Sequence, residues 1–319
     1  MNLAVRVFDP SLSEEWDFFC DRSHQSTFLH SRKFLSYHED RFKDCSLIIE
    51  ENEKCVGIFP AALDPNNEEL VISHPGSTYG GILHNGSLRG ERMISALSLI
   101  TKFYSNQNKR KLFYKAVPSF YHLTPAQDDL YALFRLGASR YRCDLSCTID
   151  VKYPLPISDR RKRSLKKSHK FGIEIREGSE YFSDFWKILA ENLSRKHGAS
   201  PVHSLLEMKN LNERFPNNIR LISGVLDDQV VAGVVMFSLP RVNHLQYIAS
   251  SDVGYETSAL DAVIHFCIED TKINGKRWFD FGISTEKNGQ YLNEGLYKFK
   301  TEFGGAGFVH EFYELNLQE

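Results

Sequence analysis

Polar and apolar residues alternate along residues 142–151, with Leu, Ile, Val or Cys at the odd positions. A period of two predicts a strand that turns its odd positions toward a core. Cys143 and Cys147 lie on that side, and we interpret both thiols as buried packing residues, since a free cysteine behaves as a small hydrophobic residue. The six cysteines form no CxxC pair and no dense cluster, so we expect neither a disulfide framework nor a metal site.

Two segments of the chain share one pattern. Residues 47–62 and 223–238 each place an apolar run, an acidic turn and a second apolar run that opens at Gly57 or Gly233. This pattern is typical of a β-hairpin. In both copies a strand, a loop with Gly or Ser, an amphipathic helix and an aromatic strand follow in the same order. The repeated order predicts a duplication, and a generic α/β pattern is the alternative.

The length of the chain agrees with a duplication. At 319 residues the chain is about twice the commonest domain size, and 42% hydrophobic residues are typical of a globular protein. We expect an α/β (α+β) fold with two tandem domains, each a mixed, mostly antiparallel sheet flanked by helices. The predicted domains span residues 1–151 and 152–319.

Positive charge is concentrated in one segment. The 39 Lys and Arg nearly balance the 41 Asp and Glu, and this average favours neither a nucleic-acid-binding nor a membrane-surface protein. Residues 160–170, however, hold seven Lys or Arg, on a helix that Ser158 or Asp159 can cap and Gly172 can end. We interpret this helix as a binding surface for phosphate in a substrate, a cofactor or RNA. A solvated surface helix neutralised by neighbouring acids is the alternative.

A second candidate anion site lies at the start of the helix predicted from Ser258 to Gly275. Ser258 and Asp261 resemble a capping box, and the helix follows directly on a strand end. Backbone N–H groups at such a junction are unpaired and carry a partial positive charge. Ser250, Gly254 and Ser258 are therefore the cofactor-binding candidates.

Four further residues have both a structural and a functional explanation. His197 closes a helix, where it either complements the helix dipole or contacts substrate. Asp280 lies in an aromatic strand and needs either an ion-pair partner or a catalytic role. Lys298 and Lys300, among aromatic residues, are either surface lysines or a positive charge for a developing anion.

The start of the chain reaches Asp9 and Pro10 too soon for a secretory signal, and nowhere do about 18 uncharged apolar residues run together. We therefore expect a cytoplasmic protein without a membrane span. The sequence shows no Ser–His–Asp, metal or P-loop pattern, so covalent nucleophile and metal chemistry are not expected.

Four separated motifs resemble those of a known family. In chain order they are RRK with LKKSHKFGI, then RKHG, then LISGVLDDQVVAGVVMFS, then FDFGIS with LNEGLYKFKTEFGG. Together they resemble the Fem-type aminoacyltransferases and their acetyltransferase-like relatives in the GNAT acyltransferase superfamily. The resemblance spans residues 155–319 and reaches the first half only through the repeat. It implies two tandem GNAT-like domains with a cleft between them, the first a degenerate copy.

The resemblance also implies a reaction and its residues. An acyl or aminoacyl group would pass by direct attack to an amino group of a phosphate-bearing acceptor, such as a peptidoglycan, polysaccharide or sugar-nucleotide precursor. Backbone N–H groups of the strand at residues 244–250 would bind the oxyanion. The resemblance assigns Arg161, Lys166 and Lys300 to holding the phosphate-bearing acceptor and the reacting carbonyl. Together with the residue patterns above, it makes Lys300, Asp280 and Tyr247 the catalytic candidates, and a core position is the alternative for the tyrosine. The substrate-binding candidates are Arg161, Lys166, Lys167, His197 and Lys298.

The implied donor is an acyl-CoA or an aminoacyl-tRNA, used as a co-substrate with no tightly bound cofactor. This choice stays open, because the chain has no long inserted helical arm and keeps only Gly254 of the Q/R-x-x-G-x-G/A phosphate loop. The alternative function is a non-catalytic module that binds tRNA or another polyanion. The sequence predicts no oligomeric state.

Overall fold

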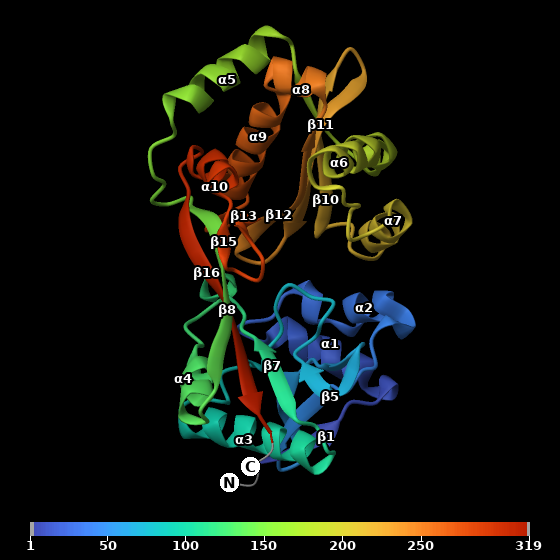
Figure 1. Ribbon diagram of the computed structural model, residues 1–319, viewed down its shortest axis with the longest axis vertical. Coiled ribbons are helices and arrows are strands. Elements are labelled where there is room, and N and C mark those ends of the chain that lie inside the picture. Colours follow the sequence, from blue (N-terminus) through green and yellow to red (C-terminus); the bar gives the residue numbers. More distant parts are fainter. Residues whose placement is uncertain (1–2, 318–319) are drawn as a thin grey trace. The chain divides into compact units, whose positions relative to one another are not determined.

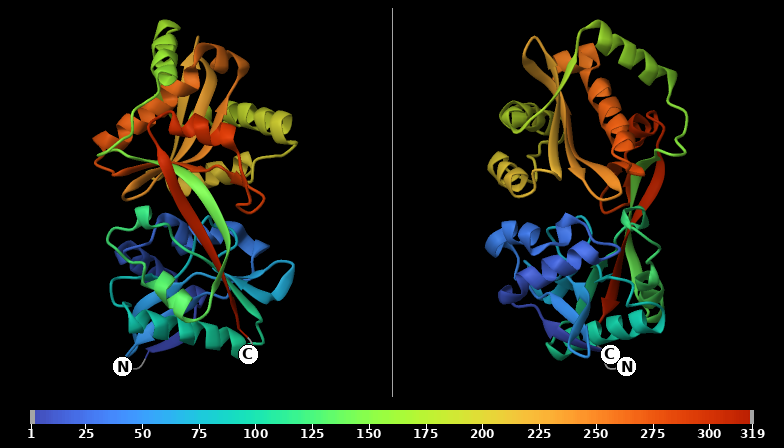
Figure 2. Two further views of the ribbon diagram at one scale, coloured as in Figure 1. Left: turned by 60° about the vertical axis from the view of Figure 1, so that its left-hand side comes forward. Right: turned by 180° about the vertical axis from the view of Figure 1, so that it is seen from behind.

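A computed structural model describes residues 3–317, apart from the side chains of residues 196 and 197 (Figures 1 and 2). The chain forms two compact units. The first consists of Met1–Asp144, Lys287–Gln290 and Val309–Glu319, and the second of Leu145–Glu286 and Tyr291–Phe308. The sequence predicts a single division after residue 151. In the structure, residues 287–290 and the last residues of the chain, from residue 309 on, belong to the first unit as well.

In the first unit, four strands form one sheet in the order β1-β2-β3-β6. Four further strands are hydrogen-bonded side by side in the order β4-β5-β7-β16. Its elements are β1 (Leu3–Val7), η1 (Pro10–Leu12), α1 (Ser13–Arg22), η2 (Phe28–His30), α2 (Arg32–Leu35), η3 (Ser36–Arg41), β2 (Leu47–Glu51), β3 (Lys54–Phe59), β4 (Ala62–Asp64), β5 (Asn67–Ile72), β6 (Leu83–His84), α3 (Glu91–Asn106), β7 (Lys111–Lys115), η4 (Ser119–Tyr121) and α4 (Asp128–Arg135). Two strands have residues in both units, β8 (Ser139–Asp150) and β16 (Ala306–Asn316).

The second unit contains the strand order β8-β13-β12-β11-β10-β9. Its elements are α5 (Asp159–Lys170), β9 (Glu174–Glu177), η5 (Ser179–Tyr181), α6 (Phe182–His197), α7 (Leu205–Arg214), β10 (Ile219–Leu226), β11 (Gln229–Ser238), β12 (Val242–Ser250), α8 (Asp252–Thr257), α9 (Ala259–Ile273), β13 (Trp278–Ile283), β14 (Thr285–Glu286), β15 (Tyr291–Leu292) and α10 (Glu294–Thr301). Helix α9 contacts β10, β11 and β12 on one face, and Figure 1 shows α6 and α7 on the opposite face.

The two predicted hairpins are confirmed as β2–β3 and β10–β11, both antiparallel. Each turns on two residues with positive φ, Asn52 and Glu53 in the first and Asp227 and Asp228 in the second. Two such residues form a type I′ turn, whose twist matches that of the flanking strands. The acidic turns of the two copies therefore have the same backbone geometry.

A parallel crossover is repeated in the two units. In the first unit α3 lies in the connection between the parallel strands β5 and β7, and in the second α9 lies in the connection between β12 and β13. Most other strand pairs are antiparallel. The predicted fold class, a mixed and mostly antiparallel sheet flanked by helices, is confirmed.

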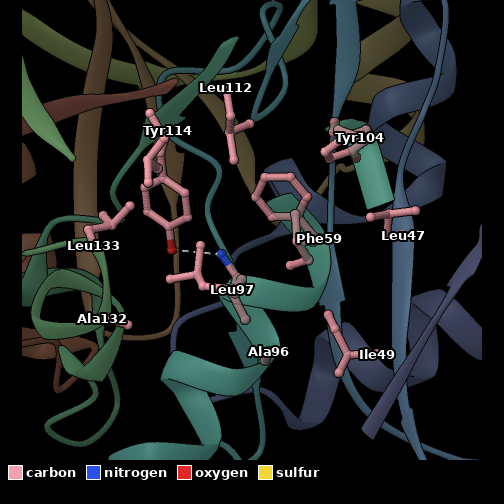
Figure 3. Packing of buried hydrophobic residues seen from close by; sticks show 14 of the residues in the cluster. Leu47, Ile49, Phe59, Ala96, Leu97, Tyr104, Leu112, Tyr114, Ala132 and Leu133 are labelled. Atoms are coloured by element: carbon pink, nitrogen blue, oxygen red, sulfur yellow. Dashed lines mark hydrogen bonds between the residues drawn. The ribbon is translucent and has the colours of Figure 1, made fainter. Parts of the chain in front are cut away.

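Apolar side chains from β2, β3, β7 and α3 fill the core of the first unit (Figure 3). Tyr114 is fully buried there, and its hydroxyl accepts a hydrogen bond from the N–H of Ile82 (2.9 Å) and donates one to Asp129 (2.7 Å). The buried hydroxyl is thus satisfied on both sides. None of the helices in residues 3–317 is both long and apolar enough to cross a bilayer.

Strand β8 differs from its prediction at two points. Cys147 is buried in the core under α9 as expected, but Cys143 is only half-buried. In addition, the polar residues Asp144, Ser146 and Thr148 are buried as well. Both faces of β8 are therefore covered, and the polar face leads to the site described next.

Candidate functional site

A buried carboxylate marks the candidate site in the second unit. Asp280 on β13 has no exposed surface, and its neighbours Phe279 and Phe281 belong to the core under α9. Because side chains alternate along a strand, Asp280 lies on the opposite face of the sheet. It accepts hydrogen bonds from Ser146 Oγ (2.5 Å), His244 Nδ1 (2.6 Å) and the N–H of Gly282 (3.2 Å). Asp280 therefore has the partners that a buried acid requires.

Strand register brings this cluster together. β13 lies between β8 and β12, and the parallel pairing places His244 directly opposite Asp280. This is the last paired position of β12 and β13, because their register covers only residues 242–244 and 278–280. The two strands separate beyond His244 and Asp280, at one end of the cluster.

Lys300 on α10 holds the last two residues of β13. Its side chain is buried, and Nζ donates to the carbonyl oxygens of Gly282 (2.8 Å) and Ile283 (2.6 Å). Burial lowers the pKa of Lys300 to about 8, while the nearby Asp280 and Cys147 act in the opposite direction. The amine is therefore mostly a cation at neutral pH, beside the buried carboxylate.

A β-bulge interrupts β12 just after His244. Val235 pairs with Tyr247 and Met236 with Leu245, so Gln246 is an extra residue in the β11–β12 ladder. A bulge leaves its extra residue outside the regular ladder and re-aims the neighbouring side chains. The irregular backbone lies inside the strand from which the sequence predicts oxyanion donors.

Tyr247 makes contacts away from this cluster. Its hydroxyl lies 2.6 Å from Nδ1 of His203 and accepts the His203 N–H at 3.2 Å, and its ring meets Trp186 of α6 edge to face. Burial raises the pKa of Tyr247. These contacts hold the tyrosine against the α6 side of the sheet.

Arg161 on the basic helix α5 is a structural anchor. Its side chain is 5% exposed and pairs with Asp261 (2.9 Å) and Glu302 (3.1 Å). Its guanidinium also lies 4.3 Å and 4.5 Å from the ring centres of Phe299 and Phe303. These contacts fix α5 to α9 and α10. The predicted role of Arg161 in binding a phosphate stays a prediction.

The other charges of α5 face solvent. Ser158 caps the helix by accepting the N–H of Arg161, as predicted. The exposed basic row consists of Arg160, Lys162, Arg163, Lys166, Lys167 and Lys170. Lys166 and Lys167 are thus placed to meet a partner. Lys298 is exposed on α10, and His197 lies outside the described side chains.

The three cofactor-binding candidates are engaged within the protein. Ser250 is fully buried, with its hydroxyl directed to the Ser251 carbonyl, and the N–H of Gly254 donates to Ser251 Oγ. Ser258 has a left-handed φ of 60° and does not cap α9 through its side chain, so the predicted capping box is wrong. The reason is that α8 runs directly into α9. Asp252, an acid, begins α8 and pairs with Arg195.

The structure thus gathers two of the three catalytic candidates, Asp280 and Lys300, with Ser146 and His244, which the sequence reading missed. The sequence alone did not show which residue pairs with Asp280 across the sheet. A strand acid that needs a partner could have been matched with the polar residue His244 near the start of β12, but only strand register makes the match unique.

Comparison with known proteins identifies the fold. Residues 158–300 match the model of the acetyltransferase (GNAT) domain. Among solved structures, the chain resembles FemX (TM-score 0.69, 10% identity, covering 98% of this chain and 97% of that one). It also resembles L-PGS from Bacillus licheniformis (TM-score 0.64, 11% identity, 96% and 91% coverage).

A tandem GNAT protein from the clavulanic acid biosynthesis pathway gives a TM-score of 0.52 at 9% identity, covering 100% of this chain and 99% of that one. Among proteins with curated functions, none matches the chain by sequence. At these identities the solved structures establish the fold, and the domain match establishes the enzyme class. The predicted tandem GNAT-like fold and acyltransferase class are confirmed. That the first domain is a degenerate copy of the second stays a prediction.

Proposed function

Because residues 158–300 form a GNAT-type acetyltransferase domain, we propose that the protein transfers an acyl or aminoacyl group, by direct attack, to an amino group of a phosphate-bearing acceptor. The observation that carries the proposal is the position of Lys300. It is a buried cation beside Asp280, where β12 and β13 separate. A buried positive charge at such a point suits a reaction that develops negative charge on oxygen.

Direct attack of an amine on a carbonyl needs three contributions from the protein: placement, donors for the oxyanion, and a proton acceptor. The bulge at Gln246 supplies a backbone outside the regular ladder for the oxyanion. An ammonium has three N–H donors, of which Lys300 gives two to Gly282 and Ile283. We assign its remaining donor and its charge to the developing oxyanion.

The exposed row of α5 supports a phosphate-bearing acceptor. Lys166 and Lys167 are exposed on a helix that Arg161 fixes to the domain, and a fixed row of cations suits a phosphate group. The acceptor class is a peptidoglycan, polysaccharide or sugar-nucleotide precursor. The donor is an acyl-CoA or an aminoacyl-tRNA, both cytoplasmic compounds, so the protein acts in the cytoplasm. The internal contacts of Ser250 and Gly254, with Asp252 beside them, favour the aminoacyl ester over a CoA pyrophosphate on this loop.

The test is transfer by the purified protein. Acetyl-CoA, longer acyl-CoAs and aminoacyl-tRNAs are offered as donors with UDP-linked amino sugars and peptidoglycan precursors as acceptors, and the products are analysed by mass spectrometry. A mass increase of one acyl or aminoacyl group on an acceptor is expected. Absence of transfer with every pair, from a folded protein, would overturn the proposed function.

The charged row of α5 has its own prediction. Replacing both Lys166→Glu and Lys167→Glu should raise KM for the phosphate-bearing acceptor by about 10-fold or more, because charge-assisted hydrogen bonds are lost, with little change in kcat. Lys54→Glu with Lys102→Glu, the same charge change at two exposed positions of the first unit, should leave KM unchanged. Equal KM values for the two variants would remove α5 from the acceptor site.

The same row favours a second candidate, a non-catalytic module for tRNA or another polyanion. This candidate predicts tRNA binding that weakens with salt, by a log–log slope of about 0.7 to 0.9 per neutralised phosphate. It also predicts that the Lys166 and Lys167 variant loses binding. Binding of this kind without transfer of any acyl group would favour the module.

A further inference from the structure

One histidine of the second unit is held by a carboxylate in the way that acid–base residues are held. His244 Nδ1 lies 2.6 Å from Oδ2 of Asp280, which is fully buried. Asp280 is itself fixed, because its Oδ1 accepts Ser146 Oγ at 2.5 Å and the N–H of Gly282 at 3.2 Å. The orientation of the imidazole ring is thus set by residues of two neighbouring strands, β8 and β13.

The hydrogen bonds also set the tautomer of His244. Oδ1 of Asp280 accepts from Ser146 Oγ and from the N–H of Gly282, and a carboxylate can only accept at its other oxygen as well. The proton between the two residues therefore belongs to Nδ1 of His244. Nε2 is then the basic nitrogen, and the carboxylate stabilises the imidazolium that forms when Nε2 takes a proton.

Burial differs between the two partners. The Asp280 side chain is 0% exposed, whereas 13% of the His244 side chain is exposed. If the pair only stabilised the packing, the imidazole could be as fully buried as the carboxylate. Here the carboxylate stays inside the sheet and the imidazole reaches its surface.

The position of His244 joins it to the candidate site. His244 is the last residue of β12 that pairs with β13, two residues before the bulge at Gln246. Gly282, whose carbonyl oxygen accepts Lys300 Nζ, packs close to the ring, since a Cβ placed on it would lie 3.4 Å from His244 Cε1. His244 therefore lies against the glycine whose carbonyl oxygen accepts Lys300, two residues before the bulge.

From this geometry we infer that His244, oriented by Asp280 and Ser146, is the proton acceptor of acyl transfer; the inference rests on the proposed function. The amine nitrogen of the acceptor forms a bond to the carbonyl carbon of the donor, and His244 Nε2 takes a proton from that nitrogen. The bond from the carbonyl carbon to the leaving sulfur or oxygen then breaks. The leaving group takes the proton from Nε2 and departs as a thiol or alcohol, which returns His244 to its neutral form.

The decisive variants are His244→Gln and His244→Ala, assayed with the donor and acceptor pair that the wild type turns over. We expect His244→Gln to lower kcat by about 10²-fold or more with KM nearly unchanged, and to remove the acid limb of the pH–rate profile. Added imidazole should restore part of the activity of His244→Ala, which a packing role does not allow. A kcat within about threefold of the wild type in both variants would overturn the inference and leave the proposed function intact.

A second measurement does not depend on turnover. Diethyl pyrocarbonate acylates the basic nitrogen of accessible histidines, and peptide mass spectrometry reports each site. We expect modification of His244 in the wild type and at least about 10-fold slower modification in Asp280→Asn, relative to the exposed His169 as internal reference. If His244 stays unmodified while His169 reacts, or if Asp280→Asn reacts at the same rate, the inference fails even where no transfer is detected.

Discussion

Replacing Lys300 with Met is expected to lower kcat of acyl transfer by about 10² to 10³-fold, the effect of removing one donor to an oxyanion. The lysine stands as a buried cation, and methionine fills a similar volume without charge or donors. Steady-state kinetics of the two proteins measure the effect. Lys102→Met, the same change at an exposed lysine of the first unit, is the matched control and should leave kcat unchanged. An unchanged kcat in Lys300→Met would exclude Lys300 from the chemistry.

The same variant has a signature in stability against pH. Lys300 has a pKa of about 8 in the folded protein, below its ordinary value of 10.5, because burial disfavours the cation. In the unfolded chain the amine keeps its proton up to the higher value, so between about pH 8 and 10.5 the unfolded state binds more protons. The wild type should therefore gain up to about 3 kcal/mol relative to Lys300→Met as pH rises through this window.

Urea unfolding of both proteins at pH 7 and pH 10 measures this gain. Other groups that titrate over the same range contribute equally to the two proteins and cancel in the difference. A difference in unfolding free energy that does not change with pH would mean that the lysine is not buried as a cation.

Arg161→Met is expected to lower the free energy of unfolding by about 3 to 5 kcal/mol, because it removes the partner of the largely buried Asp261 and leaves Glu302 only the exposed Arg160, at 3.7 Å. Arg163→Met, on the same helix but exposed, should change it by less than about 0.5 kcal/mol. Urea denaturation of the two variants gives the comparison.

The design separates an anchor from a substrate contact. If Arg161 were a phosphate ligand, its loss would raise KM and leave stability close to that of Arg163→Met. If it is the anchor, adding Asp261→Asn and Glu302→Gln to Arg161→Met should recover part of the lost stability, because the unpaired charges are removed.

The contrast at Arg161 shows what the sequence could and could not predict. The charge density of residues 160–170 and the cap at Ser158 follow from neighbours in the chain, and both were predicted. The burial of Arg161 depends on Asp261 and Glu302, which are distant in sequence and come close only through the packing of α5 on α9 and α10. No local pattern distinguishes Arg161 from Arg163.

The same division applies to the fold and the site. The two hairpins followed from acidic turns between apolar runs, since a two-residue turn is a local property. Alternation in β8 identified the position of Cys147 but not the burial of Ser146, whose partner Asp280 lies on another strand. Asp280 and Lys300 stood out because acids and lysines among aromatic residues need partners. His244 did not, because its importance comes from strand register.

The first unit has a consequence for how the protein is made. Strand β7 of this unit pairs with residues 312–316 of β16, which are synthesised about 200 residues later. The sheet can be completed only after residues 312–316 have been synthesised. Until then the edge of β7 is exposed, and an uncovered strand edge invites pairing with other chains. The pairing of β7 with the late strand β16 therefore covers an edge that the growing chain would otherwise present.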